Sequence, residues 1–328
     1  MKTFLRLLFF FLAPMLVLMY PADRYLSAQL SKSVHFALGE YPVWNALTSG
    51  KLDADVLVYG SSRAWVHFNP EVIQDSLHLP AYNLGMDGHG LPFQYLRHQM
   101  VLEYNKKPKL IIHSIEPGSL VKQPSCNYEQ FMPYMLGSRE IEQTTAGYEG
   151  FNRFQFWLPL LRYTGHWDAV RVALHQAQHP DNPEEGRKRG FRSNPSAWTN
   201  DFEEAKKREK ELVMVMNDSL LSLLDRYLQE VKQEQIPIVL VYCPTYIEGQ
   251  QYIRDHDKML AVLKQHAQQA QVPFLDFSRD TLCYHREYFY NANHMNSRGV
   301  AIFNRTLIQQ VKALFPKLLQ ASSSAEIH

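Results

Sequence analysis

Residues 56–63 read VLVY followed by GSSR, so a short apolar run passes directly into a glycine and two serines. Four consecutive apolar residues of this kind, ended by turn-forming residues, predict a buried strand at 56–59. Open α/β sheets place their sites at the carboxyl ends of strands, so we expect Ser61 and Ser62 at such a site. The same Gly-Ser-Ser sequence is also ordinary turn chemistry, in which hydroxyls bond backbone groups.

Further β-rich runs follow this one and alternate with helical patterns, which is typical of βαβ units around a mostly parallel sheet. We therefore predict an α/β fold with three layers: a mostly parallel five-stranded, flavodoxin-like sheet with flanking helices. The remaining strands are expected at 81–84 (AYNL), 110–115 (LIIHSI), 238–242 (IVLVY) and 274–277 (FLDF).

Several helices can be placed between these strands by their caps and apolar spacing. Asn69 as N-cap and Pro70 at the first position predict a helix over 70–77. The charged run at 203–211 is interpreted as the solvated face of a long helix, not as a binding patch. The other helices are expected at 91–104, 202–232, 252–269 and 297–314, the last with Ser297 as N-cap.

The segment after the third strand, residues 117–200, has no clear strand and is rich in aromatic residues up to Trp167. We interpret it as an insertion. Its aromatic side chains could form a lid or a wall that stacks on sugars, or could pack as a small core of their own. Packing is the interpretation that we favour.

The N-terminus reads MKTFLRLLFFFLAPMLVLMY over residues 1–20, a basic start followed by an apolar run. The alternatives are a cleaved signal peptide, for which Ser31 and Ser33 offer only a weak site, and a buried helix. We favour an uncleaved single-pass anchor in the cytoplasmic membrane, with the main domain outside the cytoplasm. The expected organisation is an anchor at 1–22, a juxtamembrane linker at 23–52, an α/β domain at 53–319 and a disordered tail at 320–328.

Charge and metal-binding residues exclude several kinds of function. The chain has 34 basic and 33 acidic residues, and a net charge of +1 gives no field that would attract nucleic acid. Its three cysteines have no metal-like spacing, and Cys243 ends an apolar run as a small buried residue would. His175 and His179 are four residues apart but lack an obvious third ligand. We expect neither a metal nor a cofactor.

A second motif, FYNANHMN at residues 289–296, precedes the last helix. Together with Gly60-Ser61-Ser62 it resembles the SGNH/GDSL hydrolase superfamily. The likeness is to its membrane-anchored, envelope-associated members, whose last motif reads F-Y-D-x-x-H-L-N. The resemblance spans the chain from about residue 53 onward. It implies that Ser62 is the nucleophile and that His294 is its base.

A third motif, YNLGMDG at residues 82–88, resembles the glycine block of the same superfamily. The resemblance implies that the backbone N–H groups of Gly85 and Ser62 hold the oxyanion. Glycine lets the backbone approach an acyl group closely, and preorganised N–H donors stabilise charge that develops on oxygen. A tight turn that needs glycine is the alternative.

The chain departs from the pattern of the superfamily at two positions. Residues 113–117 read HSIEP where many relatives have Gly-x-Asn-Asp, so the usual oxyanion asparagine has no counterpart. Asn291 stands where the resemblance implies an aspartate. Its carbonyl can orient His294 but cannot stabilise the imidazolium by charge, and the same replacement in a serine protease costs about 10⁴ in rate. Carboxylates that could substitute are Asp276, Asp280 and Glu287.

Arg63, next to the nucleophile, could bind an anionic group of the substrate or could form only a salt bridge. The resemblance implies an esterase or O-acyltransferase that acts on an envelope polysaccharide or on another acylated small molecule, beside a membrane-bound O-acyltransferase partner. The rival hypotheses are a catalytically impaired SGNH-like protein that binds an envelope component, and a purely structural protein that assembles through the inserted aromatic segment.

Overall fold

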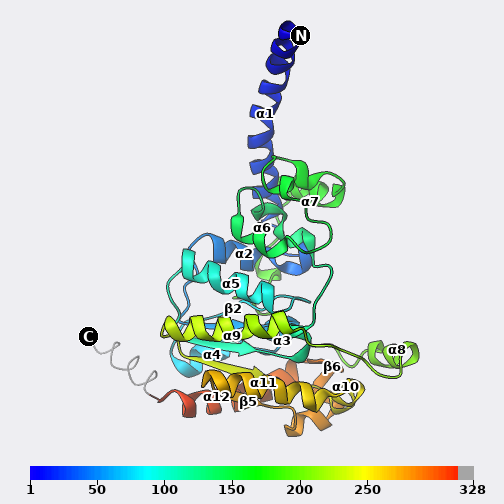
Figure 1. Cartoon of the computed structure of the whole chain (residues 1–328). Helices are drawn as coiled ribbons and strands as arrows, with labels where there is room; N and C mark the ends of the chain where they lie inside the picture. Colours follow the sequence, from blue (N-terminus) through cyan, green and yellow to red (C-terminus); the bar gives the residue numbers. More distant parts are fainter. Residues whose placement is uncertain (317–328) are drawn as a thin grey trace. The chain divides into compact units, whose positions relative to one another are not determined.

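The computed structural model describes residues 1–316, and within the N-terminal helix the side chains at 2, 5, 8, 9 and 11–16 are outside the described part. The tail expected at 320–328 also lies outside the described residues. The chain divides into two compact units (Figure 1). Unit 1 holds residues 1–45 and 123–187, and unit 2 holds residues 46–122 and the chain from 188 onward.

Unit 2 is built on a sheet of five parallel strands in the order β2-β1-β3-β4-β5. This is the flavodoxin-like order of a doubly wound fold, and it is consistent with the SGNH-like fold expected from the sequence. All five strands lie where the sequence predicts them, although three end one residue earlier. Their bounds are β1 (Val56–Tyr59), β2 (Ala81–Asn83), β3 (Leu110–Ser114), β4 (Ile238–Tyr242) and β5 (Phe274–Asp276).

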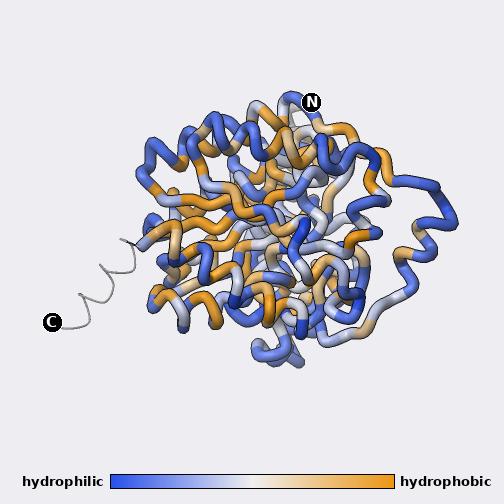
Figure 2. Tube along the Cα trace, turned by 90° about the horizontal axis from the view of Figure 1, so that it is seen from below, coloured by the Kyte–Doolittle hydropathy of each residue, from blue (hydrophilic) through white to orange (hydrophobic). Residues whose placement is uncertain are grey.

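The sheet is buried on both faces, as parallel sheets are. Val56 and Val58 belong to the apolar core on one face, whereas Leu57 and Tyr59 point to the other. Figure 1 shows α4 and α12 on one side of the sheet and α5 and α9 on the other, which confirms the three layers. The helix traces in Figure 2 alternate between hydrophobic and hydrophilic residues, as amphipathic helices do.

Three helices begin and end where the sequence predicts them because local signals fix their ends. Asn69 accepts a hydrogen bond from the Glu71 N–H and caps α4, with Pro70 at the first position. The N-cap of α12 is Asn296, not Ser297, because the Asn296 side chain accepts from the N–H groups of Arg298 and Gly299. These helices are α4 (Pro70–Leu77), α5 (Leu91–Tyr104) and α12 (Ser297–Leu314).

Two predicted helices are each divided in the structure. Residues 209–217 are not helical: the Leu212 N–H donates to Tyr252 O, and Asn217 starts a new helix as its N-cap. The single helix expected at 202–232 is therefore wrong. The helix expected at 252–269 is interrupted at Asp255, which adopts a φ of 56°. The observed helices are α8 (Asp201–Arg208), α9 (Asp218–Gln233), α10 (Ile247–Tyr252) and α11 (His256–Ala270).

A small antiparallel hairpin that the sequence does not predict lies before α12. Its strands are β6 (Phe289–Asn291) and β7 (His294–Met295), and Asn291 pairs with His294. Short helices complete unit 2. They are α3 (Ser62–His67) and the 3₁₀ helices η2 (Pro117–Leu120), η7 (Thr281–Tyr284) and η8 (Arg286–Tyr288).

Unit 1 combines the N-terminal residues with most of the insertion. Phe131 and Phe156 are buried, and the Trp44 and Phe131 rings meet edge to face with centroids 5.4 Å apart. Some of the inserted aromatic residues thus pack in a core that they share with the N-terminal residues, as the packing interpretation expects, whereas Phe154, Trp157 and Trp167 are exposed. The elements are α1 (Lys2–Leu30), η1 (Phe36–Gly39), α2 (Tyr41–Thr48, which continues into unit 2), η3 (Tyr128–Tyr134), α6 (Arg139–Thr145), η4 (Arg153–Phe156), η5 (Leu161–Tyr163), α7 (Trp167–Gln178) and η6 (Pro183–Glu185).

Among the described side chains, no helix is long and apolar enough to cross a bilayer. Cys126, Cys243 and Cys283 are free thiols. Cys243 is buried at the end of β4 as expected, and burial raises its pKa to about 12, which makes it inert as a nucleophile.

Candidate active site

The backbone turns sharply between β1 and α3 and presents Ser62 at the carboxyl edge of the sheet. Gly60 has a φ of +142°, and a Cβ there would lie 2.6 Å from Ser114 O on the neighbouring strand. Only glycine fits this turn. Ser61 follows as the N-cap of α3, and Ser62 is the first helical residue and is partly exposed. The nucleophile candidate is thus held on a rigid junction that solvent can reach.

The β6–β7 hairpin places His294 directly against this serine. Ser62 Oγ lies 2.8 Å from His294 Nε2, although the two residues are far apart in the sequence. The Ser62–His294 pair inferred from the two motifs is therefore brought together in the structure, at hydrogen-bond distance. This is the arrangement by which a histidine takes a proton from a serine hydroxyl.

Asn291 fixes the orientation and the tautomer of His294. Asn291 Oδ1 accepts from the backbone N–H groups of Asn293 and His294, each at 3.0 Å. Because these two groups are donors, the amide atom that faces them must be the oxygen and not the nitrogen. The same oxygen lies 3.0 Å from His294 Nδ1. Nδ1 must then carry the ring proton and donate it, because an oxygen cannot donate here. Nε2 is left with its lone pair toward Ser62.

The surroundings of His294 favour its neutral form. Burial first, and the positive charge of Arg63 second, lower the pKa of His294 to about 3. The Tyr290 ring stacks on the imidazole with centroids 5.4 Å apart and planes 9° apart. His294 is therefore unprotonated at neutral pH, and an imidazolium formed there would meet no carboxylate among its described contacts.

Arg63 and Glu116 form an ion pair beneath the nucleophile. Arg63 Nε lies 3.1 Å from Glu116 Oε2, and both side chains are nearly buried. The Ser61 hydroxyl donates to the other oxygen of Glu116, and Arg63 Nη2 donates to Asn293 Oδ1 at 3.2 Å. Of the two roles considered for Arg63, the structure shows the salt bridge. Its guanidinium ties the nucleophile helix to the loop that carries the base.

The geometry at Gly85 contradicts a free oxyanion donor in this arrangement. The Gly85 N–H donates to Asn83 Oδ1 at 2.9 Å, whose amide nitrogen bonds the carbonyls of Ala64 and Phe68. A Cβ at Gly85 would lie 2.4 Å from the backbone nitrogen of Trp65, so only glycine can pack this closely on α3. The N–H of Ser62 remains a suitable donor, because the first helical residue has no intrahelical partner for it.

Three carboxylates that could have replaced the missing aspartate bond elsewhere. Asp276 pairs with Lys264 at 2.5 Å, and Asp280 caps the Leu282 N–H. Glu287 lies 3.4 Å from His285. None of the three bonds to His294 among the described contacts, so Asn291 is the partner of the base.

Two aromatic neighbours of His294 are not indicated by any motif or spacing in the sequence. His67 on α3 is fully buried, its ring centroid is 5.9 Å from that of His294, and its Nε2 accepts from the Met295 N–H. Burial, and then the charges of His294 and Arg63, hold the pKa of His67 well below its usual value. Tyr290 stands inside the quoted motif, but its stacking requires the hairpin, which the sequence did not predict.

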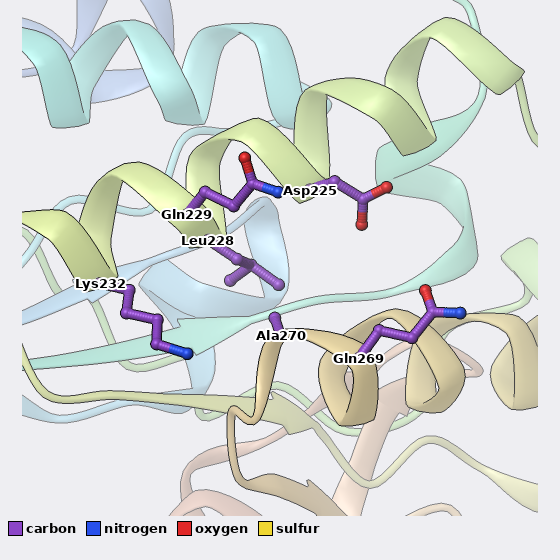
Figure 3. A pocket seen from close by; sticks show the side chains of 6 residues that line it. All are labelled: Asp225, Leu228, Gln229, Lys232, Gln269 and Ala270. Carbon is purple, nitrogen blue, oxygen red and sulfur yellow. The ribbon is translucent and has the colours of Figure 1, made fainter.

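A pocket of about 330 Å³ lies beside the β6–β7 hairpin, bordered by Asn291, Ala292 and Asn293 and by residues of α8 and α10. A second pocket, of about 310 Å³, lies between α9 and α11 (Figure 3). Two polar groups that line it are engaged, since Lys232 donates to Gln271 and Asp225 pairs with His266. We assign no ligand to this second pocket.

Metal-binding residues do not gather in the described part of the chain: no group of three or more His, Cys, Asp or Glu side chains could hold an ion there. His175 and His179, expected to be solvated, are exposed, with ring centroids 5.2 Å apart.

Comparison with known proteins gives distant similarities of fold. No protein-family model matches the chain, and none of the curated proteins matches it. Among solved structures, the chain is similar to a proposed acylhydrolase of Bacteroides fragilis, with 14% identity and a TM-score of 0.38 over 80% of this chain and 87% of the other. It is also similar to a GDSL-like lipase of Bacteroides thetaiotaomicron, with 11% identity and a TM-score of 0.39 over 83% of this chain and 97% of the other.

Proposed function

We propose that the protein is a serine acyl hydrolase or acyltransferase that cleaves an ester through Ser62 and His294. One observation carries the proposal: Ser62 Oγ, His294 Nε2, His294 Nδ1 and Asn291 Oδ1 form a continuous chain, with contacts of 2.8 and 3.0 Å. A nucleophile, a base and an orienting group in this order are the working parts of acyl transfer.

The proposed reaction proceeds in two steps. His294 Nε2 takes the Ser62 proton while Ser62 Oγ attacks the ester carbonyl, and the Ser62 N–H stabilises the oxyanion. The intermediate collapses to acyl-Ser62, and the leaving alcohol takes the proton from His294. Water or a sugar hydroxyl then gives its proton to His294 and attacks the acyl carbon. The bond to Ser62 Oγ breaks, Ser62 Oγ takes the proton back from His294, and the acid or the transferred ester is released.

The substrate and the cellular setting extend the same proposal. The resemblance of the motifs points to an acylated envelope polysaccharide, and to a membrane-bound O-acyltransferase as partner. The N-terminal part of α1 supports a membrane location, because several of its described apolar side chains are exposed, among them Phe4, Phe10 and Val17. We propose that this segment holds the protein at the outer face of the cytoplasmic membrane.

A second candidate function is that of a binding protein with an impaired catalytic site. The neutral amide of Asn291 and the nearby charge of Arg63 favour it, since both disfavour the imidazolium. In a serine protease, loss of the aspartate charge costs about 10⁴ in rate, or about 5 kcal/mol of transition-state stabilisation. Slow turnover would leave the fold suited to holding an acylated ligand.

Labelling with a fluorophosphonate separates the two functions, because this probe reacts only with activated serines. The full-length chain is expected to be labelled once, at Ser62, and to hydrolyse an aryl acetate. Ser62→Ala should lose both properties. Ser61→Ala is the matched control: it removes the neighbouring hydroxyl, which serves Glu116, and should still be labelled.

Two results would contradict the catalytic proposal. Folded wild-type protein that neither labels nor turns over would leave the binding function. Labelling that persists in Ser62→Ala would place the reactive serine elsewhere.

A further inference from the structure

Unit 1 encloses only the C-terminal end of α1, and the boundary lies near Asp23. Asp23 forms an ion pair with Arg162 at 2.7 Å, and both side chains are fully buried. Ser27 and Leu30, further along the helix, are also buried. On the N-terminal side of Asp23, six described apolar side chains are 58% to 70% exposed: Phe4, Leu7, Phe10, Val17, Leu18 and Tyr20. Within about one turn, between Tyr20 and Asp23, α1 therefore changes from a helix with exposed apolar side chains to a helix that is packed in unit 1.

Exposed apolar side chains also occur on the parts of unit 1 that pack against α1. The Leu160 N–H donates to Asp23 Oδ2 at 2.6 Å, which fixes the chain after η4 beside the boundary residue. Immediately before it, Trp157 and Leu158 are about half exposed, at 52% and 45%. Phe154 lies edge to face with Trp157, with centroids 6.2 Å apart. These side chains remain in solvent although they adjoin a buried ion pair.

The outer face of α7 carries two large exposed apolar side chains among polar ones. α7 packs on α1 through its face with Ala169 and Ala173, which are buried. Trp167 and Leu174 lie seven residues apart on the opposite face, and are 69% and 50% exposed. Figure 1 shows α7 at the end of unit 1 from which the N-terminal part of α1 extends.

We infer that these side chains form a second membrane contact, in which unit 1 rests on the surface of a lipid bilayer around α1. The contact consists of Tyr20, Phe154, Trp157, Leu158, Trp167 and Leu174, named here the aromatic collar. Tryptophan and tyrosine favour the level of the lipid headgroups, where the ring is partly apolar and the N–H or O–H stays wet. The occupant is a lipid surface because the collar adjoins the exposed apolar half of α1.

The charges around the collar suit the same surface. Arg153 lies over the Trp157 ring, with its guanidinium carbon 4.4 Å from the centroid, so its charge can reach lipid phosphates while its stem covers the ring. Trp157 Nε1 donates to Glu142 at 3.4 Å, and Asp168 is paired with Arg171. These two carboxylates beside the collar thus have partners within unit 1.

Quenching of tryptophan fluorescence by brominated lipid tests the contact. The full-length chain is reconstituted into vesicles of phosphatidylcholine and phosphatidylglycerol, brominated either near the headgroup or near the methyl end of the acyl chain. We expect stronger quenching by the shallow bromine. The quenching should be lost in Trp157→Phe/Trp167→Phe, which keeps the apolar surface but removes both reporters. Trp44, Trp65 and Trp198 remain in this variant as internal controls.

The inference rests on the membrane location proposed for α1, and vesicle flotation separates the two. A chain that floats with vesicles but is not quenched overturns the collar and leaves the anchor. A chain that does not float overturns both. Quenching that persists in Trp157→Phe/Trp167→Phe also overturns the collar. Hydrolysis of a soluble aryl acetate should be equal in wild type and variant, so failure of the catalytic proposal is detected independently.

Discussion

The nucleophile and the base of the candidate site have opposite electrostatic settings. Around Ser62, a carboxylate and a guanidinium are paired under the helix, and Glu116 also accepts from Ser61. Around His294, the orienting group is the neutral amide of Asn291. The site thus keeps the geometry of a catalytic triad, but its negative charge lies on the nucleophile side. Orientation and charge, which one aspartate usually supplies together, are separate properties here.

Asn291→Asp restores the charge on the base side and should have the largest effect. We expect the rate of aryl acetate hydrolysis to rise by up to about 10⁴, since the carboxylate stabilises the imidazolium. The carboxylate should also raise the pKa of His294, so the acid limb of the kcat/KM profile moves from far below pH 6.5 toward neutrality. Asn293→Asp is the matched control, because it adds a charge to the same loop without replacing the group that faces Nδ1. An equal gain in rate in both variants would contradict the idea that the charge must lie on the group that orients His294.

Glu116→Ala removes the charge from the nucleophile side. It leaves the nearly buried Arg63 without its carboxylate, and we expect a loss of about 3–5 kcal/mol in the free energy of unfolding, measured with urea. Glu71→Ala breaks an exposed ion pair with Lys188 and should cost less than about 1 kcal/mol. Similar losses of unfolding free energy in the two variants would show that the buried ion pair contributes no more to stability than the exposed one.

Lowering the pH tests both the site and the interior of unit 2. Burial lowers the pKa of His98 to about 4 and that of His113 to about 3, as it does for His67 and His294. Below pH 6.5 the unfolded chain binds protons at these histidines and the folded chain does not. Stability should therefore fall with decreasing pH, by up to about 1.4 kcal/mol per pH unit for each histidine. His113→Gln should make the unfolding free energy depend less steeply on pH. An unchanged slope in that variant would contradict the lowered pKa of His113.

Tyr290→Leu should have the smallest effect, because it removes only the ring stacked on His294. An aromatic pair contributes about 0.5–1.5 kcal/mol, which corresponds to a decrease of about 2- to 10-fold in kcat/KM. Tyr284→Leu, at an exposed position, is the control and should leave kcat/KM unchanged. A loss far above tenfold would mean that Tyr290 does more than hold the imidazole in place.

The sheet and several helices could be predicted because their signals are local. The runs VLVY, LIIHSI and IVLVY are buried on both faces, so each reads as a continuous apolar stretch. The ends of α4 follow from Asn69 and Pro70. The helical spacing of apolar residues continued through 209–217, however, where backbone bonds to Tyr252 and a new N-cap at Asn217 override it.

The proximity of Ser62 and His294 could be predicted from motifs, but the electrostatics of the pair could not. Parallel strands bring the ends of β1 and β3 together, which places Ser62 and Glu116 on one edge of the sheet. The pairing of Glu116 with Arg63 and Ser61, however, depends on how the side chains at that edge are oriented, which the sequence does not show. The same holds for Gly85, since only the fold shows that it packs on α3 and donates to Asn83.

Because of the Asn291 amide, the hydrolytic activity of the purified protein should depend on how long the protein has been stored. Asparagine carries an amide NH2 where aspartate carries an oxygen, and hydrolysis of side-chain amides, which consumes water and releases ammonia, is a slow, ordinary reaction of stored proteins. If the aspartate form turns over about 10⁴ times faster, one converted molecule in about 10⁴ would equal the activity of all the others. Freshly prepared protein should then be the least active, and its activity should grow with the fraction whose mass at residues 289–296 has increased by that exchange.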